Sequence, residues 1–170
     1  MVNATTEYVQ RTPITTVLSS GGWVVAWADN GANLNDRSLV AQVFASNGSN
    51  VGGEISLADT GTTFYSLAPL KTGGWVFNWR NFDSETFEQS IFQRVFDDLG
   101  NSTTGVEQVN SANNGPIVSL HTMARAEGGW TTVWTTRNSG VPNITYMQRF
   151  NESGEEVGDN AQLLFSSGSH

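Results

Sequence analysis

One short motif occurs three times in this chain. Residues 21–27 read GGWVVAW, residues 73–79 read GGWVFNW, and residues 128–134 read GGWTTVW. The tryptophans that open the copies are 52 and 55 residues apart, and the copies contain all six tryptophans of the 170-residue chain. Self-similarity at a period of about 50 residues is the signature of a repeat architecture. The sequence therefore predicts three units of one design.

Further landmarks keep the same register in each unit. A phenylalanine is followed four residues later by a glycine, a glutamine lies just before the phenylalanine, and an apolar stretch precedes each Gly-Gly pair. The phenylalanines are Phe44, Phe96 and Phe150, the glycines are Gly48, Gly100 and Gly154, and the glutamines are Gln42, Gln93 and Gln148. Because several independent positions recur together, chance is a poor explanation.

Each unit is expected to form four short strands. In the first unit these are residues 13–18, 23–27, 38–45 and 54–58, rich in β-branched and aromatic residues and separated by turn formers. Asn47-Gly48 is the type of pair that favours a two-residue hairpin turn. Side chains alternate along a strand, so the two tryptophans of each motif share one face.

The register divides the chain into three units and two short ends. Residues 11–60, 61–112 and 113–165 are the units, and residues 160–165 are the last strand. Residues 1–10 contain an apparent lone strand, at residues 7–10, similar to the fourth strand of a preceding unit. Residues 166–170 form a polar tail.

Composition excludes several classes of function. Sixteen acidic residues against eight Lys and Arg give a formal charge of −8, and nucleic acid binding needs the opposite sign. The absence of cysteine excludes disulfides and thiolate metal sites. No apolar run approaches the ~18 residues of a membrane-spanning helix. An acidic module that neither enters membranes nor binds nucleic acid is expected.

The unit resembles repeats of large bacterial surface and secreted proteins of the hemolysin-type, calcium-binding class. The resemblance rests on an apolar strand, Gly-Gly-Trp-Val-Val-x-Trp, a polar loop, x-Gln-x-Phe, Asn/Asp-x-x-Gly and Gly-x-Glu, and it covers residues 7–165. It is clear in the first two units and weaker in the third. The resemblance implies four-stranded, propeller-like blades in a secreted or cell-surface protein, with an adhesion or binding role and no specific activity. The Asp/Gly-rich nonapeptide calcium repeats of that class are absent.

An all-β fold of propeller-like blades is therefore predicted, with a β-trefoil-like body of three-fold symmetry as the alternative. Propellers close with about 4–8 blades, so three blades do not close a ring alone. Open blade edges favour association. A homo-oligomer is expected, and a dimer with six blades is favoured.

The tryptophans divide into two predicted roles. Trp27, Trp79 and Trp134 are expected in the core between units. The tryptophans next to the Gly-Gly turns are also expected to pack in the core, but they are the candidates for stacking on sugar rings at a rim, one site per unit. These candidates are Trp23, Trp75 and Trp130.

The loops after each second strand offer oxygen ligands that suit calcium. The candidates are Asp29, Asn33, Asp36, Asp83 and Glu85. The third loop, residues 137–142, has no carboxylate, so such a site would not repeat, and solvated turn chemistry is the simpler interpretation. No other cofactor is expected.

Catalysis has little support in the sequence. His121 is the one histidine away from the C-terminus, and nothing near it resembles a nucleophile elbow. No spacing singles out a pair of carboxylates for a hydrolase. The leading hypothesis is a non-enzymatic module that self-associates and presents loops for adhesion or ligand binding. A lectin is the alternative, and a hydrolase using loop carboxylates is the less favoured third hypothesis.

Overall fold

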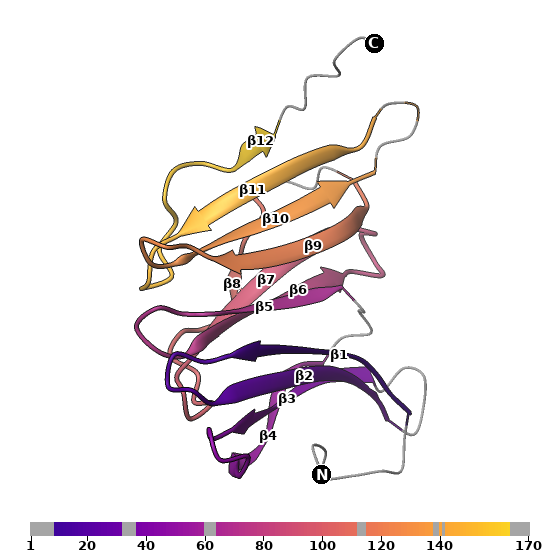
Figure 1. Cartoon of the computed structure of the whole chain (residues 1–170). Helices are drawn as coiled ribbons and strands as arrows, with labels where there is room; N and C mark the ends of the chain where they lie inside the picture. The colour runs from indigo at the N-terminus through magenta and orange to yellow at the C-terminus, as the bar shows by residue number, and fades with distance from the viewer. Residues whose placement is uncertain are drawn as a thin grey trace, which may run out of the picture.

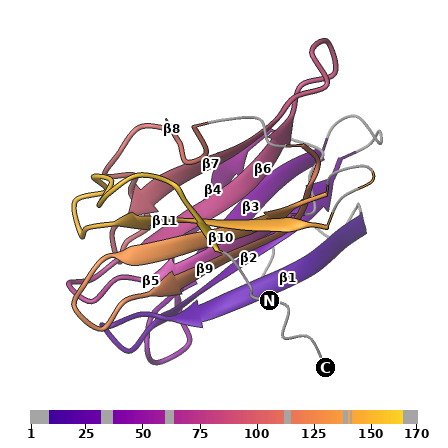
Figure 2. The same ribbon diagram turned by 90° about the horizontal axis from the view of Figure 1, so that it is seen from above.

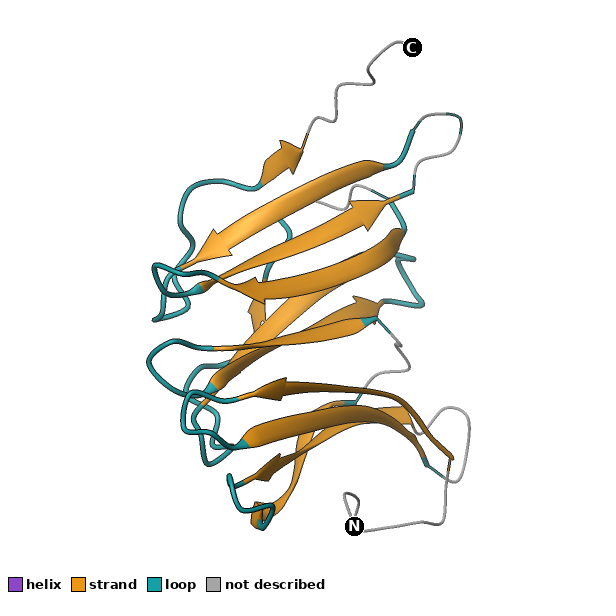
Figure 3. Cartoon of the chain, viewed as in Figure 1, coloured by secondary structure: helices purple, strands orange, loops and turns teal. Residues whose placement is uncertain are grey.

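The computed structural model describes residues 9–31, 37–59, 64–111, 115–137, 140 and 142–163. In these residues twelve strands form three four-stranded antiparallel sheets, each in chain order, and no helix is present (Figure 3). Each sheet is called a blade below and numbered along the chain. The all-β prediction with three four-stranded units is confirmed.

The strand bounds show one blade in each repeat. Blade 1 consists of β1 Val9–Val17, β2 Trp23–Asn30, β3 Arg37–Phe44 and β4 Asn50–Ala58. Blade 2 consists of β5 Tyr65–Pro69, β6 Trp75–Phe82, β7 Gln89–Phe96 and β8 Glu107–Gln108. Blade 3 consists of β9 Ile117–Ala124, β10 Trp130–Thr136, β11 Ile144–Phe150 and β12 Ala161–Leu163.

The blades form a fan around their first strands. In Figure 1 blade 1 extends downward, blade 3 extends upward, and blade 2 recedes from the viewer between them. Seen from above, the hairpin between β6 and β7 projects beyond the sheets (Figure 2). β5 lies between β1 and β9 and contacts both. First strands near an axis and later strands toward a rim are the arrangement of propeller blades. The predicted alternative, a β-trefoil-like body of three-fold symmetry, is not observed. Blades 1 and 3 lie at opposite ends of the fan instead of packing around a common three-fold axis.

The Gly-Gly pair of each motif has a steric cause. The first glycine closes a three-residue turn and has a positive φ, as at Gly73 (110°) and Gly128 (105°), where L side chains are strained. The second glycine lies against the carbonyl oxygen of the third-strand phenylalanine. A Cβ at Gly129 would lie 2.1 Å from the Phe150 oxygen, and one at Gly74 would lie 2.1 Å from the Phe96 oxygen.

The turn at Asn47-Gly48 differs from its prediction. Ala45 N–H donates to Ser49 O over 2.9 Å, and Gly48 N–H donates to Ala45 O over 2.9 Å, so three residues lie in the loop. The predicted two-residue turn is wrong. Gly48 has a φ of 85°, which fits the left-handed final position of a three-residue hairpin loop.

The start of β1 corrects part of the predicted lone strand. Val9 pairs with Asn30 and Gln10 pairs with Asp29, so both residues extend β1 in blade 1 instead of belonging to another blade. An irregularity between Arg11 and Ile14 interrupts the ladder between this stretch and the rest of β1. Residues 1–8 and the predicted tail at 166–170 lie outside the described residues.

Two apolar clusters hold the fan together. One lies between blades 1 and 2, and the other lies between blades 2 and 3. Trp27, Trp79 and Trp134 are 4%, 5% and 1% exposed. Trp79 and Trp134 belong to the clusters between blades, as predicted, whereas Trp27 is buried but belongs to neither cluster. The described residues include no helix that is long and apolar enough to cross a membrane.

Candidate functional site

The three candidate sugar-stacking tryptophans differ in exposure. Trp75 and Trp130 are 0% exposed, and their indoles stack on Phe96 at 4.2 Å and Phe150 at 5.2 Å between ring centroids. A sugar cannot reach a ring without exposed surface. The hypothesis that these two tryptophans form rim sites is therefore wrong, because the neighbouring blade covers them.

Trp23 alone of the three is partly exposed. It stacks on Phe44 at 5.5 Å, as its repeats do on theirs, so the local packing is the same. The difference lies in what covers the ring. Trp75 and Trp130 pack in the interfaces between blades, whereas no described blade precedes blade 1.

The repeated glutamines do not share one face. Gln42 and Gln148 lie opposite Val25 and Thr132, on the tryptophan side of their blades. Gln93 lies opposite Asn78 on the other side, because it precedes its phenylalanine by three residues instead of two. Its position in the sequence suggested equivalence, and the strand alternation rules that out.

The glutamines accordingly form hydrogen bonds with different parts of the fold. Gln42 Nε2 donates to Val51 O over 3.1 Å and Gln148 Nε2 donates to Gly158 O over 2.8 Å, so each ties its third strand to the segment that follows. Gln93 Oε1 accepts a hydrogen bond of 3.1 Å from Trp130 Nε1, which links blade 2 to blade 3.

The predicted calcium ligands are only partly placed. Asp29 lies at the end of β2 rather than in a loop, and Asn33 and Asp36 lie outside the described residues. Asp83 Oδ1 accepts hydrogen bonds from Glu85 N–H (2.8 Å) and Thr86 N–H (3.2 Å). This carboxylate thus stabilises its own turn, and hydrogen bonds from both N–H groups hold its pKa below the usual value. The described residues contain no cluster of three or more His, Asp or Glu side chains suited to a metal.

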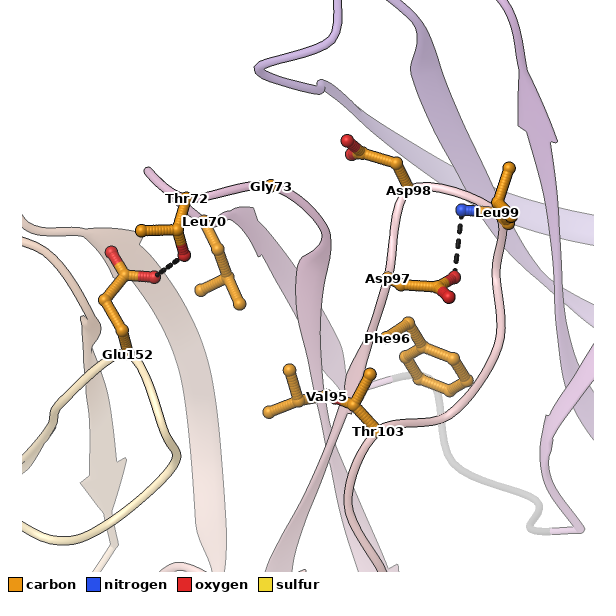
Figure 4. Close-up of a pocket in the computed structure, with 10 residues that line it drawn as sticks. All are labelled: Leu70, Thr72, Gly73, Val95, Phe96, Asp97, Asp98, Leu99, Thr103 and Glu152. Carbon is orange, nitrogen blue, oxygen red and sulfur yellow. Dashed lines mark hydrogen bonds between the residues drawn. The ribbon is translucent and has the colours of Figure 1, made fainter.

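A cleft of about 370 Å³ lies between the turns of blades 2 and 3 (Figure 4). Its acids are Asp97, Asp98 and Glu152. Asp98 Oδ1 accepts from Gly74 N–H over 2.8 Å, and Glu152 Oε1 accepts from Gly129 N–H over 2.9 Å. Figure 4 shows Asp98 and Glu152 on opposite sides of the turn that carries Thr72 and Gly73. These carboxylates anchor the Gly-Gly turns and do not converge on one point.

Protonation also argues against acid catalysis in this cleft. Burial raises the pKa of Glu152, but hydrogen bonds from Gly129 N–H and the Thr72 hydroxyl outweigh it, so the pKa lies below its usual 4.5. Burial likewise raises the pKa of Asp97, and hydrogen bonds from Asn101 outweigh it. A general acid of a glycosidase needs a raised pKa. Both side chains are instead held as carboxylates.

Glu152→Gln is expected to reduce stability by roughly 1 kcal/mol at neutral pH, the size of one net hydrogen bond. Because the folded pKa is lowered, the carboxylate contributes stability above pH 4.5, and this contribution disappears as pH falls through the folded pKa. Urea unfolding of both proteins between pH 7 and pH 3 measures the difference. A gap between the two proteins that stays constant or widens toward pH 3 contradicts this prediction.

A second groove, of about 390 Å³, lies where β4 of blade 1 meets blade 2. Its lining combines aromatic rings with polar side chains. The lining includes the aromatic residues Trp79 and Phe92 and the polar residues Arg94, Asn81 and Asp59, beside residues of β4. Arg94 Nε is buried and has no hydrogen-bond partner among the described residues. This atom is therefore a donor that lacks an acceptor within the described part of the chain.

Sequence reasoning did not identify Arg94. The residue lies opposite Phe77 in β7, where Gln42 and Gln148 lie opposite Val25 and Thr132 in the other blades. The signal was a break in the repeat, with arginine where two units have glutamine. Because Gln93 was treated as the equivalent of Gln42 and Gln148, the arginine at the true equivalent position was overlooked.

No family model matches the sequence, and no curated protein matches it. Among solved structures, it is similar to an endo-arabinase from Bacteroides thetaiotaomicron, with a TM-score of 0.55 and 13% identity. The match covers 98% of this chain, which spans 60% of the length of that protein. At this identity the likeness concerns the fold alone, and the endo-arabinase has a propeller fold. This supports the description of the three sheets as blades.

Proposed function

We propose that this chain is a non-enzymatic module of a secreted or cell-surface protein and that it binds a saccharide in the groove between blades 1 and 2. The observation that carries the proposal is the groove itself. Aromatic rings, an arginine with an unpaired buried Nε, and an amide line one open volume of about 390 Å³. Pockets of this kind, with a few convergent polar groups, are the default ligand sites of proteins.

A neutral saccharide suits the groove better than an anion. The chain has a net charge of −8 and Asp59 lies at the groove, so a polyanion would be repelled. Hydroxyl groups of a sugar can accept from Arg94 and donate to Asp59, while its C–H face packs on the partly exposed ring of Phe92. The name of the structural neighbour, an endo-arabinase, supports a carbohydrate ligand and makes arabinan the first one to test.

Two observations support a binding role rather than catalysis. Asp98 and Glu152 are engaged by backbone N–H groups of the Gly-Gly turns. His121 is exposed on β9. The resemblance to hemolysin-type repeats supports the extracellular setting, in which such modules adhere to surfaces.

Titration calorimetry with arabinan and other neutral oligosaccharides tests the proposal. We expect binding by the wild type and a loss of about tenfold or more in affinity for Arg94→Gln, since hydrogen bonds to charged groups contribute about 1.5–3 kcal/mol. Arg125→Gln is the matched control, because Arg125 forms an ion pair with Glu127 in a hairpin of blade 3, away from the groove.

Three results would overturn the proposal. Equal affinity of Arg94→Gln and wild type would remove the groove as the binding site. Release of reducing sugar ends from arabinan by the purified chain would show an enzyme. No binding to any member of the panel would exclude the saccharide class.

A further inference from the structure

We propose that the chain pairs with a second copy of itself, with the Trp23 side of blade 1 packed on the Met147 side of blade 3 in the partner. This inference rests on the blade-module part of the proposed function and does not involve the saccharide groove. It follows from the two interfaces within the chain, between blades 1 and 2 and between blades 2 and 3. In both, the same two sides of the blades pack together.

Each blade has two sides, which strand alternation defines. The tryptophan side carries the two motif tryptophans, and the opposite side carries the residues between them. In both internal interfaces the tryptophan side of one blade packs on the opposite side of the preceding blade. Trp75, Phe77 and Trp79 of blade 2 share a cluster with Val24 and Ala26 of blade 1.

The second internal interface repeats this arrangement with polar contacts. Trp130 Nε1 donates to Gln93 Oε1 over 3.1 Å, and Thr132 Oγ1 donates to Asn78 Oδ1 over 3.2 Å. The residue of blade 2 that receives the indole is therefore Gln93, in the middle of β7. In any blade, the residue equivalent to Gln93 therefore marks where the first motif tryptophan of the following blade would lie.

Blade 1 has no partner on its tryptophan side among the described blades. Trp23 and Val25 are half-buried there, and Val17, which pairs with Trp23 in the ladder, is 67% exposed, whereas Trp27 and Gln42 on the same side are 4% and 2% exposed. Trp23 belongs to neither apolar cluster, whereas Trp75 and Trp130 each belong to one. The end of this side that carries Val17, Trp23 and Val25 is thus open to a blade that the described residues do not supply.

Blade 3 presents the complementary side. Met147 pairs with Val133, as Gln93 pairs with Asn78, so Met147 occupies the position that faces the next tryptophan. Met123, 54% exposed, lies beside it opposite Thr131. Flexible methionine side chains pack well against aromatic rings. The exposed Arg149 and His121 lie on the same side.

The two free sides can be used together. In Figure 1 blades 1 and 3 extend in opposite directions and blade 2 recedes between them, so the two free sides belong to the two end blades of the fan. A second fan that packs on both end blades meets both free sides at once. Two identical head-to-tail interfaces result, and six blades fall within the ~4–8 of closed propellers.

Analytical ultracentrifugation of the intact chain tests this pairing. The wild type is expected at twice the chain mass of 18.4 kDa, with an isolated monomer only on strong dilution. Val17→Glu and Met147→Arg are each expected to raise the dimer dissociation constant at least tenfold. Val17 is already largely exposed, so its replacement should leave the monomer folded, which the melting temperature verifies. Phe87→Glu, at a 75% exposed residue of the β6–β7 hairpin, is the matched control.

A charge exchange tests the predicted register. Trp23→Glu and Met147→Arg are each expected to give monomers, and the double variant is expected to dimerise again at low salt, because the new charges face each other. A double variant that stays monomeric, although its melting temperature equals that of the single variants and so shows that it is folded, would overturn this register.

Other outcomes contradict the pairing as a whole. A wild type at the monomer mass up to about 100 μM would overturn it, because interfaces of this type reach micromolar affinity or better. Masses that extend beyond the dimer would overturn the closed pair. Arg94→Gln should leave the dimer intact and Val17→Glu should leave saccharide binding intact, so either proposal can fail alone.

Discussion

Trp130→Ala is expected to lower the free energy of unfolding by about 3–5 kcal/mol. The side chain is 0% exposed, stacks on Phe150 and donates to Gln93, so its removal leaves a cavity and an unpaired buried acceptor. Chemical denaturation at a concentration where the chain is monomeric measures the change.

Trp23→Ala is the matched comparison for this prediction. The ring has the same stacking partner in its repeat, but it is partly exposed, so a loss well below that of Trp130→Ala is expected in the monomer. Equal losses for the two variants would show that the blade interface contributes little to stability.

Gly129→Ala is expected to destabilise the chain by more than about 3 kcal/mol or to prevent folding. The new Cβ would lie 2.1 Å from the backbone oxygen of Phe150, and the φ of 73° is itself strained for alanine. Backbone cannot move aside as a flexible side chain can, so the turn or β11 must shift.

Gly53→Ala is the control for this substitution. Its added Cβ meets nothing within 4 Å and its φ lies outside the left-handed region, so a change within about 0.5 kcal/mol is expected. Thermal unfolding of both variants provides the comparison. A Gly129→Ala protein with the same melting temperature as the wild type would contradict the steric account of the Gly-Gly motif.

The strands were predictable because their causes are local. Alternation, β-branched residues and turn formers place β2, β6 and β10 within the three motifs, and the repeat register assigns four strands to each unit. Positive φ values at Gly48, Gly100 and Gly154 have the same local cause. The irregularity in β1 was not predictable, because pairing on either side of it depends on Ala28 and Ala26 in the next strand.

The candidate site was less predictable. Sequence spacing placed Gln93 with Gln42 and Gln148, but a shift of one residue moves a side chain to the other side of a sheet. Arg94 therefore lies at the groove and Gln93 lies in the interface with blade 3. The partners of Asp98 and Glu152 were equally hidden, because Gly74 and Gly129 are distant in the chain.

The sequence by itself determined the number of blades, the strands in each and the glycines that close their turns, because hydrogen-bonded hairpins depend on neighbours a few residues away. It also determined that the tryptophans of each motif share a side. Only the tertiary structure decided that Trp75 and Trp130 are covered while Trp23 is partly open. Exposure depends on which blade packs against which, and similar local sequences meet different neighbours at the middle and at the ends of a fan.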